Sequence, residues 1–362
     1  MQTEAKCHDD LRVMQFVDQV EAAAEESARD AYRLAFERLR SQIPLHPDRG
    51  ASAARVYESA SATVRMLAER CLPLATAIAM HLYPLCALQC IPVPLLSIAR
   101  VQRALLLNTI RSRSLILANA GSERARGIEK PLIASRDANG LRIDGICEYM
   151  SLSSVADVVL FKAHFADIDE TALCAADLKA DSVRVGEWKF NGTLRFSDTA
   201  SVTFTHHRVP RGRYVILRNA AGLQCVADYQ RCWFHLFLAD MYLARLERLH
   251  GIHGLQPSQG FIVSRNEAAR LREYSLHLLD RFDLHRDAAS LMNTTSALKL
   301  RVSLMTQGII DSLRGMLPED RSNMIAADIA ELSCIRFQPT ADERILQGLC
   351  MRPVAPTLAL ST

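Results

Sequence analysis

Residues Gly140 to Asp157 read GLRIDGICEYMSLSSVAD, and this stretch decides the fold class. It follows directly on Asn139, and an Asn-Gly pair between short apolar runs is a strong hairpin signal, because both residues tolerate the backbone angles of a tight turn. We therefore expect the runs Leu132–Ser135 and Leu141–Ile143 to belong to a β-hairpin.

Short, partly β-branched runs separated by turn formers continue on both sides of this stretch. They predict a middle domain of mostly antiparallel β-structure over residues 114–222, a small barrel or sandwich of roughly a hundred residues. The other runs are Ser114–Ala118, Val158–Phe161, Ser182–Val185, Val202–Thr205 and Tyr214–Leu217, and Asn191-Gly192 marks a further turn.

Apolar residues recur at three- and four-residue intervals before and after the β section, which is typical of amphipathic helices. We expect a helical N-terminal domain over residues 1–113 and a C-terminal helical bundle over residues 223–362, so the fold class is α+β. The predicted helical runs are Leu11–Ile43, Ala54–Glu69, Ile98–Ile110, Tyr229–His250, Ser264–Phe282, Ala288–Leu313 and Met324–Ile335.

The stretch Cys71–Ala99 is long and apolar enough to resemble a membrane span. It contains Pro73, Pro84, Pro92 and Pro94, and prolines at this spacing break a single spanning helix into pieces. We expect two buried helices that meet at a turn, and no contact with a membrane.

The composition argues against several functional classes. Lys and Arg number 43 against 40 Asp and Glu, which leaves a net charge of +3 and no basic stripe for nucleic acid. The N-terminus, MQTEAKCHDD, lacks the apolar region of a signal peptide, and the ten cysteines are scattered rather than framed as in a small secreted scaffold. We expect a cytoplasmic protein.

Two segments of the β section resemble the acyl-CoA dehydrogenase family. Gly140–Asp157 matches the family segment in which a strand pair ends in an aromatic residue, an aliphatic residue and Ser or Thr, followed by Ala-Asp. Glu187–Pro210 is similar to the family's Gly-x-Arg-x-Ser-x-Thr turn and its strand closed by Val-Pro, with one extra residue between Gly192 and Arg195. The α, β, α order extends the resemblance over most of the chain.

The resemblance implies an FAD whose isoalloxazine ring lies between the β domain and the C-terminal helices, with an acyl thioester against the opposite face of the ring. Tyr149-Met150-Ser151 matches the triplet that contacts the ring. Ser122 with Glu123 matches the start of a second contacting turn, although Arg124 replaces the family's proline. Ser122 and Ser151 could instead satisfy loop backbone groups.

Glutamine occupies both positions at which the family carries its catalytic base. One branch places a Glu directly before an Arg on the first C-terminal helix, where this chain has Gln230 and Arg231. The other branch places it in a Tyr-Glu-Gly-Thr loop, where this chain has Gln338. A carboxamide does not accept a proton at physiological pH, so neither glutamine can abstract one from a substrate. Asp228 would replace Gln230 only if the helix were rotated by about half a turn.

The resemblance therefore implies a flavin-dependent oxidoreductase acting on an acyl thioester, carried on CoA or on an acyl carrier protein, in a specialised reaction such as oxygen chemistry at the flavin. Gln230 would then orient a substrate carbonyl. The site lacks the family's Arg-x-x-Phe-Gly pattern, and Leu313–Met316 keeps one glycine where the family has two. A flavin-free member of the fold that catalyses an elimination or cyclisation, or only binds a carrier-linked chain, is the alternative. The long C-terminal helices favour a homodimer or homotetramer.

No sequence pattern indicates a metal site. His206 and His207 are neighbours on a predicted strand and therefore point to opposite faces. Cys86 and Cys90 are one helical turn apart, without a second pair at zinc spacing. We expect these four side chains to be structural.

Overall fold

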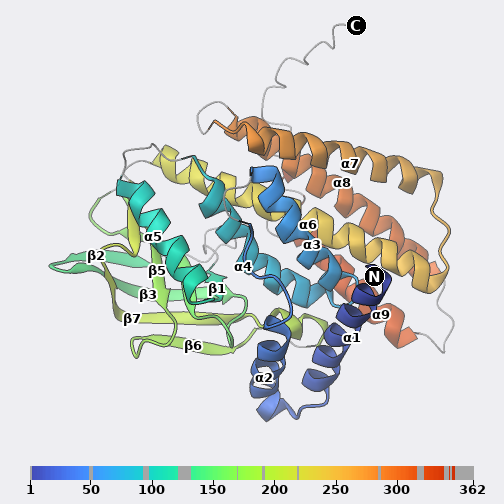
Figure 1. Cartoon of the computed structure of the whole chain (residues 1–362), viewed down its shortest axis with the longest axis horizontal. Coiled ribbons are helices and arrows are strands. Elements are labelled where there is room, and N and C mark those ends of the chain that lie inside the picture. Colours follow the sequence, from blue (N-terminus) through green and yellow to red (C-terminus); the bar gives the residue numbers. More distant parts are fainter. Residues whose placement is uncertain are drawn as a thin grey trace, which may run out of the picture.

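This computed structural model contains a mixed β-sheet (Figure 1). Along the chain, one group of helices precedes the sheet and a second group follows it. The structure describes residues 2–337, 342, 345 and 346, apart from 49–51, 93–97, 121–131, 169, 190–191, 218–219, 284–286 and 316–321. In Figure 1, α5 lies across one side of the sheet, while α6, α7 and α8 pack side by side as a bundle.

Helices α1 to α4 contribute to one apolar core, whereas α5 packs with residues of β1, β4 and β5 in a second apolar cluster. The run Leu11–Ile43, predicted to be helical, is divided between α1 and α2 by a short 3-10 turn. Ser52 caps α3, because its side chain accepts a hydrogen bond from the backbone amide of Arg55. The bounds are α1 Gln2–Glu21, η1 Glu25–Ser27, α2 Ala28–Arg40, α3 Ala53–Ala68, α4 Leu72–Cys90 and α5 Ile98–Ser112.

Helix α4 continues through Pro73 and Pro84 and ends at Cys90, before Pro92, so these two prolines do not divide the apolar stretch. Pro73 lies in its first turn, where the missing amide has no partner to lose, and Pro84 lies inside the continuous helix. By length and composition α4 is the one described helix that could cross a membrane, yet 83% of its most apolar window is buried inside the protein. It packs against α3, α6 and β1, so α4 is a core helix, and this burial outweighs the cost of Pro84.

The strands form one eight-stranded sheet in the order β6-β7-β3-β2-β4-β5-β8, with β1 also paired to β4. The pairing is mostly antiparallel, as predicted, but β1 and β2 both run parallel to β4. β5 has no counterpart in the prediction, because TALCAAD is rich in alanine, which is a weak strand former. The bounds are β1 Leu117–Asn119, β2 Ile133–Asp137, β3 Gly140–Met150, β4 Val158–Phe165, β5 Thr171–Asp177, β6 Val183–Trp188, β7 Ala200–Pro210 and β8 Tyr214–Leu217.

The β2–β3 hairpin forms at the predicted Asn-Gly pair. Asp137 pairs with Gly140, so Ala138 and Asn139 make the two-residue connection. A Cβ atom on Gly140 would lie 2.2 Å from the carbonyl oxygen of Val209 on β7, so only glycine allows this close approach.

The sheet is curved, so that side chains of β4 and β7, which are not neighbours in the sheet, pack against each other. The rings of Phe161 on β4 and Phe204 on β7 lie 4.5 Å apart between centroids, although β3 and β2 separate these strands in the sheet. The aromatic pair therefore joins the two halves of the β section.

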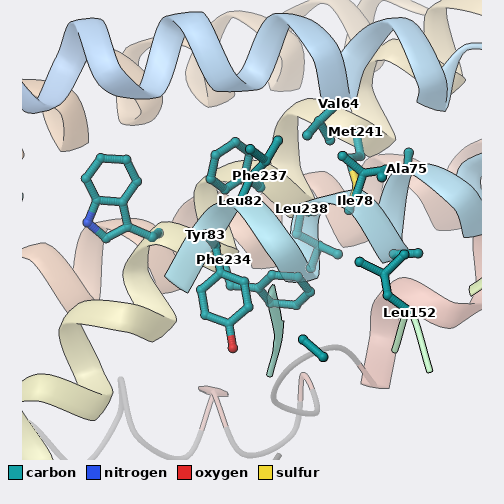
Figure 2. Close-up of a cluster of buried hydrophobic side chains, with 14 of the residues drawn as sticks. Val64, Ala75, Ile78, Leu82, Tyr83, Leu152, Phe234, Phe237, Leu238 and Met241 are labelled. Atoms are coloured by element: carbon teal, nitrogen blue, oxygen red, sulfur yellow. The ribbon is translucent and has the colours of Figure 1, made fainter. Parts of the chain in front are cut away.

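The C-terminal helices begin with the long helix α6, which packs along α4. Figure 2 shows Ile78 and Leu82 of α4 beside Phe237 and Met241 of α6 in one buried apolar cluster. This core runs through all three segments, so the division into residues 1–113, 114–222 and 223–362 stays a prediction. The bounds are α6 Ala220–His253, α7 Gln259–Asp280, α8 Ala288–Gly315, α9 Ser322–Ser333 and η5 Cys334–Phe337.

Candidate functional site

The end of β3 brings two of the predicted segments together. Met150 is completely buried and pairs with Ala120, just after β1. The triplet Tyr149-Met150-Ser151 therefore lies beside the chain that leads towards Ser122, which itself falls outside the described residues. Tyr149 is half-buried, and the ammonium group of Lys189 lies 5.7 Å from the centre of its ring.

Three hydroxyl groups form a hydrogen-bonded chain that starts at Ser151. Ser197 donates to the carbonyl oxygen of Leu194 at 2.8 Å, so its single proton is not available to Thr199. Thr199 must then donate to Ser197 across a 3.0 Å contact, and Ser151 must donate to Thr199 across a 3.1 Å contact. Ser151 consequently keeps only lone pairs and can accept an N–H from a bound molecule.

The buried carboxyl group of Asp198, which sequence reasoning missed, fixes the loop that follows Ser151. It accepts hydrogen bonds from the Ser153 hydroxyl at 2.8 Å, the Ser154 amide at 2.7 Å and the Trp188 indole at 2.6 Å. Burial raises the pKa of Asp198, and these hydrogen bonds oppose the rise. Leu152 and Asp198 both have left-handed backbone angles, with φ of 59° and 47°, and the hydrogen bonds offset the strain.

The predicted pair Gln230 and Arg231 lies on the N-terminal half of α6. Gln230 is buried, and Arg231 turns back to Asp228, with its Nη1 3.1 Å from Oδ1 of that carboxylate. Residues two apart on a helix point in nearly opposite directions, so Asp228 does not take the place of Gln230. Gln338 lies outside the described residues.

Three polar residues that sequence reasoning missed lie beside Arg231. Asn119 at the end of β1 donates its side-chain amide to the hydroxyl oxygen of Tyr83 on α4. Lys162 on β4 shares a face with Asn119, because Asn119 is in register with Leu160, two residues before Lys162. One signal could have revealed this lysine, since it interrupts the apolar run VVLF of β4.

The charge of Arg231 acts on both Tyr83 and Lys162, and Tyr83 packs against Phe234, which lies three residues beyond Arg231 on α6. Burial raises the pKa of Tyr83 and lowers that of Lys162, and the Arg231 guanidinium acts to lower both. In Figure 2 the Tyr83 hydroxyl points away from the apolar side chains, while its ring lies 5.0 Å from that of Phe234 on α6. The ring of Tyr83 therefore packs in the apolar core, while its hydroxyl group lies at the edge of that core and binds Asn119.

The end of β1 thus contacts both the predicted triplet and Tyr83. Asn119 binds Tyr83, on which the charge of Arg231 acts, and the next residue, Ala120, pairs with Met150. The acceptor oxygen of Ser151, the ring of Tyr149 and the hydroxyl of Tyr83 are the groups suited to hold a planar cofactor. Such groups can orient a molecule and donate or accept hydrogen bonds, but none is a carboxylate base.

His235, one turn beyond Arg231 on α6, is a second buried polar residue without a role in the predicted site. Its side chain is 1% exposed, and neither ring nitrogen has a hydrogen-bond partner among the residues that the structure describes. Burial, assisted by the charges of Arg231 and Lys299, lowers its pKa to about 3. The imidazole is therefore neutral at physiological pH.

The residues considered as metal ligands are dispersed. Among the described residues, no three His, Cys, Asp or Glu side chains are placed to hold a metal ion. His206 is exposed and pairs with Asp144 at 2.9 Å, whereas His207 is buried and hydrogen-bonds Ser182 at 2.8 Å. The two histidines thus face different surroundings, as neighbours on a strand should.

Comparison with known proteins gives no match by sequence but extensive matches by structure. No protein-family model and no curated protein matches the chain. The FAD complex of PigA aligns with a TM-score of 0.68 at 14% identity and covers 96% of both chains. Methanesulfinate monooxygenase MsuC from Pseudomonas fluorescens aligns with a TM-score of 0.69 at 15% identity and covers 96% of this chain and 94% of that one.

Dibenzothiophene monooxygenase TdsC from Paenibacillus sp. A11-2 gives the same result, with a TM-score of 0.64 at 14% identity over 96% of both chains. The aligned PigA structure is a complex with FAD, and TdsC also has a structure with bound FMN. Identity this low shows the fold alone, and the described chain has the acyl-CoA dehydrogenase-like fold.

Proposed function

We propose that this protein is a flavin-dependent oxidoreductase. The observation that supports the proposal is the arrangement at the end of β1, where Ala120 pairs with Met150 of the predicted triplet and Asn119 donates a hydrogen bond to Tyr83, whose ring packs against Phe234 on α6. The aligned structures of PigA with FAD and of TdsC with FMN support the same class of cofactor.

The residues around Ser151 fit the edge of a flavin. The isoalloxazine ring carries N–H groups, and the hydroxyl chain leaves Ser151 as a hydrogen-bond acceptor. When bound, a flavin supplies a two-electron acceptor that reacts with oxygen once it is reduced. Ser151 would accept a hydrogen bond from the ring, Asp198 would hold the Ser151 loop in place, and Tyr149 would offer an aromatic surface.

Oxygen chemistry suits these residues better than α,β-dehydrogenation of an acyl thioester. Dehydrogenation requires a carboxylate to take the α proton, whereas Gln230 is a carboxamide and Asp228 is bound to Arg231. Two of the aligned enzymes are monooxygenases of dibenzothiophene and methanesulfinate by name. An acyl thioester on CoA or on a carrier protein remains a proposed substrate, and Gln230 would then donate its amide N–H to the thioester carbonyl.

The absorbance spectrum of the purified protein tests the cofactor. We expect flavin bands that persist through gel filtration, either on isolation or after incubation with FMN or FAD. After chemical reduction, re-oxidation of the bound flavin in air-saturated buffer should consume oxygen. Colourless protein that retains neither flavin would overturn the proposal and favour a flavin-free member that catalyses elimination or cyclisation, or only binds its ligand.

The substitution Gln230→Glu tests the thioester separately. Supplying the missing base should yield enoyl product from a saturated acyl thioester if the α carbon lies below residue 230. Gln230→Met is the matched control, because it has similar size and no carboxyl group. A folded, flavin-loaded Gln230→Glu protein that forms no enoyl product would remove saturated thioesters from the candidate substrates.

Self-association through the long C-terminal helices is part of the proposal as well. Light scattering of the purified protein tests it, with a dimer or tetramer as the expected result.

A further inference from the structure

Lys162 is a cation placed where the sheet is otherwise apolar. Its neighbours on the same face of β1 and β4 are Asn119, Leu117 and the buried Leu160. Its ammonium group makes no hydrogen bond and no ion pair within 4 Å to any residue in the described part of the chain. A half-buried lysine loses hydration, and burial accordingly lowers its pKa.

Arg231 and Tyr83 both retain N–H or O–H groups that can donate further hydrogen bonds. Arg231 uses Nη1 on Asp228, and its guanidinium, with 38% of the side chain exposed, retains further N–H groups. Tyr83 accepts a hydrogen bond from Asn119, which leaves its own O–H free to donate. Tyr83, Lys162 and Arg231 are called the donor cluster below.

The donor cluster carries an excess of positive charge. Lys162 and Arg231 contribute two positive charges, and Asp228 is the one carboxylate whose field acts on Lys162. His235, which also lies near Arg231, is neutral because burial lowers its pKa to about 3. Buried charges are usually paired, and Lys162, Arg231 and Asp228 together leave a net charge of +1 among these groups.

We infer that Tyr83, Lys162 and Arg231 together bind one oxyanion group of a ligand, either a carboxylate of the substrate or a phosphate of the flavin. The ammonium and guanidinium groups neutralise the oxyanion, and the Tyr83 O–H donates a hydrogen bond to one of its oxygens. The inference rests on the proposed function, which supplies the flavin phosphate, whereas the carboxylate would belong to a substrate not yet identified.

The donor cluster is tested by titrating the purified protein with sodium acetate and with inorganic phosphate. Chloride replaces these anions in the reference titration, so that the ionic strength stays constant. We expect Lys162→Met to weaken anion binding about tenfold or more, and Tyr83→Phe about threefold. Tyr83→Phe keeps the ring and its packing, so it serves if Lys162→Met fails to fold. Lys179→Met is the matched control, because that lysine is 79% exposed in its pair with Asp157, and binding should not change.

Parallel titrations with riboflavin, FMN and FAD distinguish the two sources. If the oxyanion is a flavin phosphate, Lys162→Met weakens FMN and FAD binding and spares riboflavin. If it is a substrate carboxylate, the variant binds all three flavins as the unaltered protein does and loses only acetate.

Two results would overturn the inference: the unaltered protein binds neither anion more tightly than chloride, or Lys162→Met loses no more affinity than Lys179→Met. The proposed function fails independently of this inference. Protein that binds acetate or phosphate through Lys162 but retains no flavin would contradict the oxidoreductase and leave the oxyanion site in place. Protein that retains flavin but binds no anion would contradict the oxyanion site alone.

Discussion

Lys299 on α8 has no exposed surface, and its ammonium group binds the carboxylate of Asp342, 43 residues further along the chain. The Ser303 hydroxyl, one turn along α8, donates to the other carboxylate oxygen at 2.6 Å. Asp342 follows Gln338 by four residues, so this ion pair ties the segment that carries the second predicted glutamine to the helical bundle.

Removing Lys299 should be strongly destabilising. Lys299→Met leaves the Asp342 carboxylate buried without its cation, which should lower the free energy of unfolding by about 3–5 kcal/mol in urea titrations. The double variant Lys299→Met, Asp342→Leu should recover much of this loss. Arg301→Met, on the same helix as Lys299, is the control, since its pair with Glu267 on α7 is partly exposed and should contribute less than about 1 kcal/mol. A double variant as unstable as the single one would contradict this account.

Replacing Gly140 and Gly308 by alanine should change the free energy of unfolding in opposite directions. Gly140→Ala places a Cβ 2.2 Å from the Val209 carbonyl oxygen, which forces β3 and β7 apart and should cost about 2–4 kcal/mol. Gly308 lies inside α8, and a Cβ there meets nothing within 4 Å. Gly308→Ala should therefore raise the free energy of unfolding by about 0.5–1 kcal/mol. Thermal melts compare the two, and equal shifts of melting temperature would contradict the close approach at Gly140.

Buried histidines should make the protein sensitive to acid. Burial lowers the pKa of His235 to about 3 and that of His81 to about 4, so the unfolded chain binds protons that the folded chain refuses. Stability should fall as the pH drops from 6.5 towards these values, by roughly 2–3 kcal/mol for each histidine by pH 4.5.

The substitution His235→Leu should remove the part of the acid-induced loss of stability that His235 causes. Both ring nitrogens lack partners among the described residues, so an apolar side chain should be tolerated at pH 7 as well. Urea titrations at pH 7 and pH 4.5 measure both effects. An unchanged difference between the two pH values would show that His235 is not the group responsible.

Glu331 should lower the stability of the protein at high pH, whereas the buried histidines lower it at low pH. Burial raises its pKa to about 7, although Arg245 at 3.2 Å opposes the rise. The stability it contributes is complete below its unfolded pKa of about 4.3 and is lost as the pH rises through 7. Glu331→Gln should therefore match the unaltered protein at pH 4.5 and exceed its free energy of unfolding by about 1–3 kcal/mol at pH 8.5. A variant that is less stable at pH 8.5 would show that the pair with Arg245 dominates.

The hydroxyl chain predicts how flavin binding responds to substitution. Ser151→Ala removes the free acceptor and should raise the dissociation constant for FMN about threefold to tenfold, measured by quenching of flavin fluorescence. Ser197→Ala is the control, because it breaks the inner end of the chain and leaves the lone pairs of Ser151 in place. Equal losses in the two variants would indicate that the chain acts through loop stability instead.

Local patterns predicted most of the elements. The runs Ala54–Glu69 and Tyr214–Leu217 correspond to α3 Ala53–Ala68 and β8 Tyr214–Leu217, because amphipathic spacing and β-branched runs are readable within a few residues. Two cases went against local preference. The alanine-rich β5 is a strand because β4 and β8 pair with it on either side, and Pro84 stays inside α4 because the helix is buried.

The residues of the candidate site also fall into two groups, those that a sequence pattern can reveal and those that it cannot. Tyr149, Ser151, Gln230 and Arg231 could be proposed from the sequence, since each belongs to a contiguous segment with a family resemblance, and their roles stay predictions. Tyr83, Asn119 and Lys162 could not be proposed in this way, because they come one each from a helix and two strands and carry no motif of their own.

The sequence by itself determined the succession of helices and strands, the Asn-Gly hairpin and the absence of a carboxylate at position 230. Hydrogen bonding along the backbone and the spacing of apolar residues are properties of neighbouring positions, so they can be recognised without knowing the packing. The folded chain brings the charge of Arg231 on α6 to bear on Lys162 on β4, and its hydroxyl chain leaves Ser151 as an acceptor rather than a donor. The partner of a charge or of a hydroxyl proton depends on groups brought from distant parts of the chain.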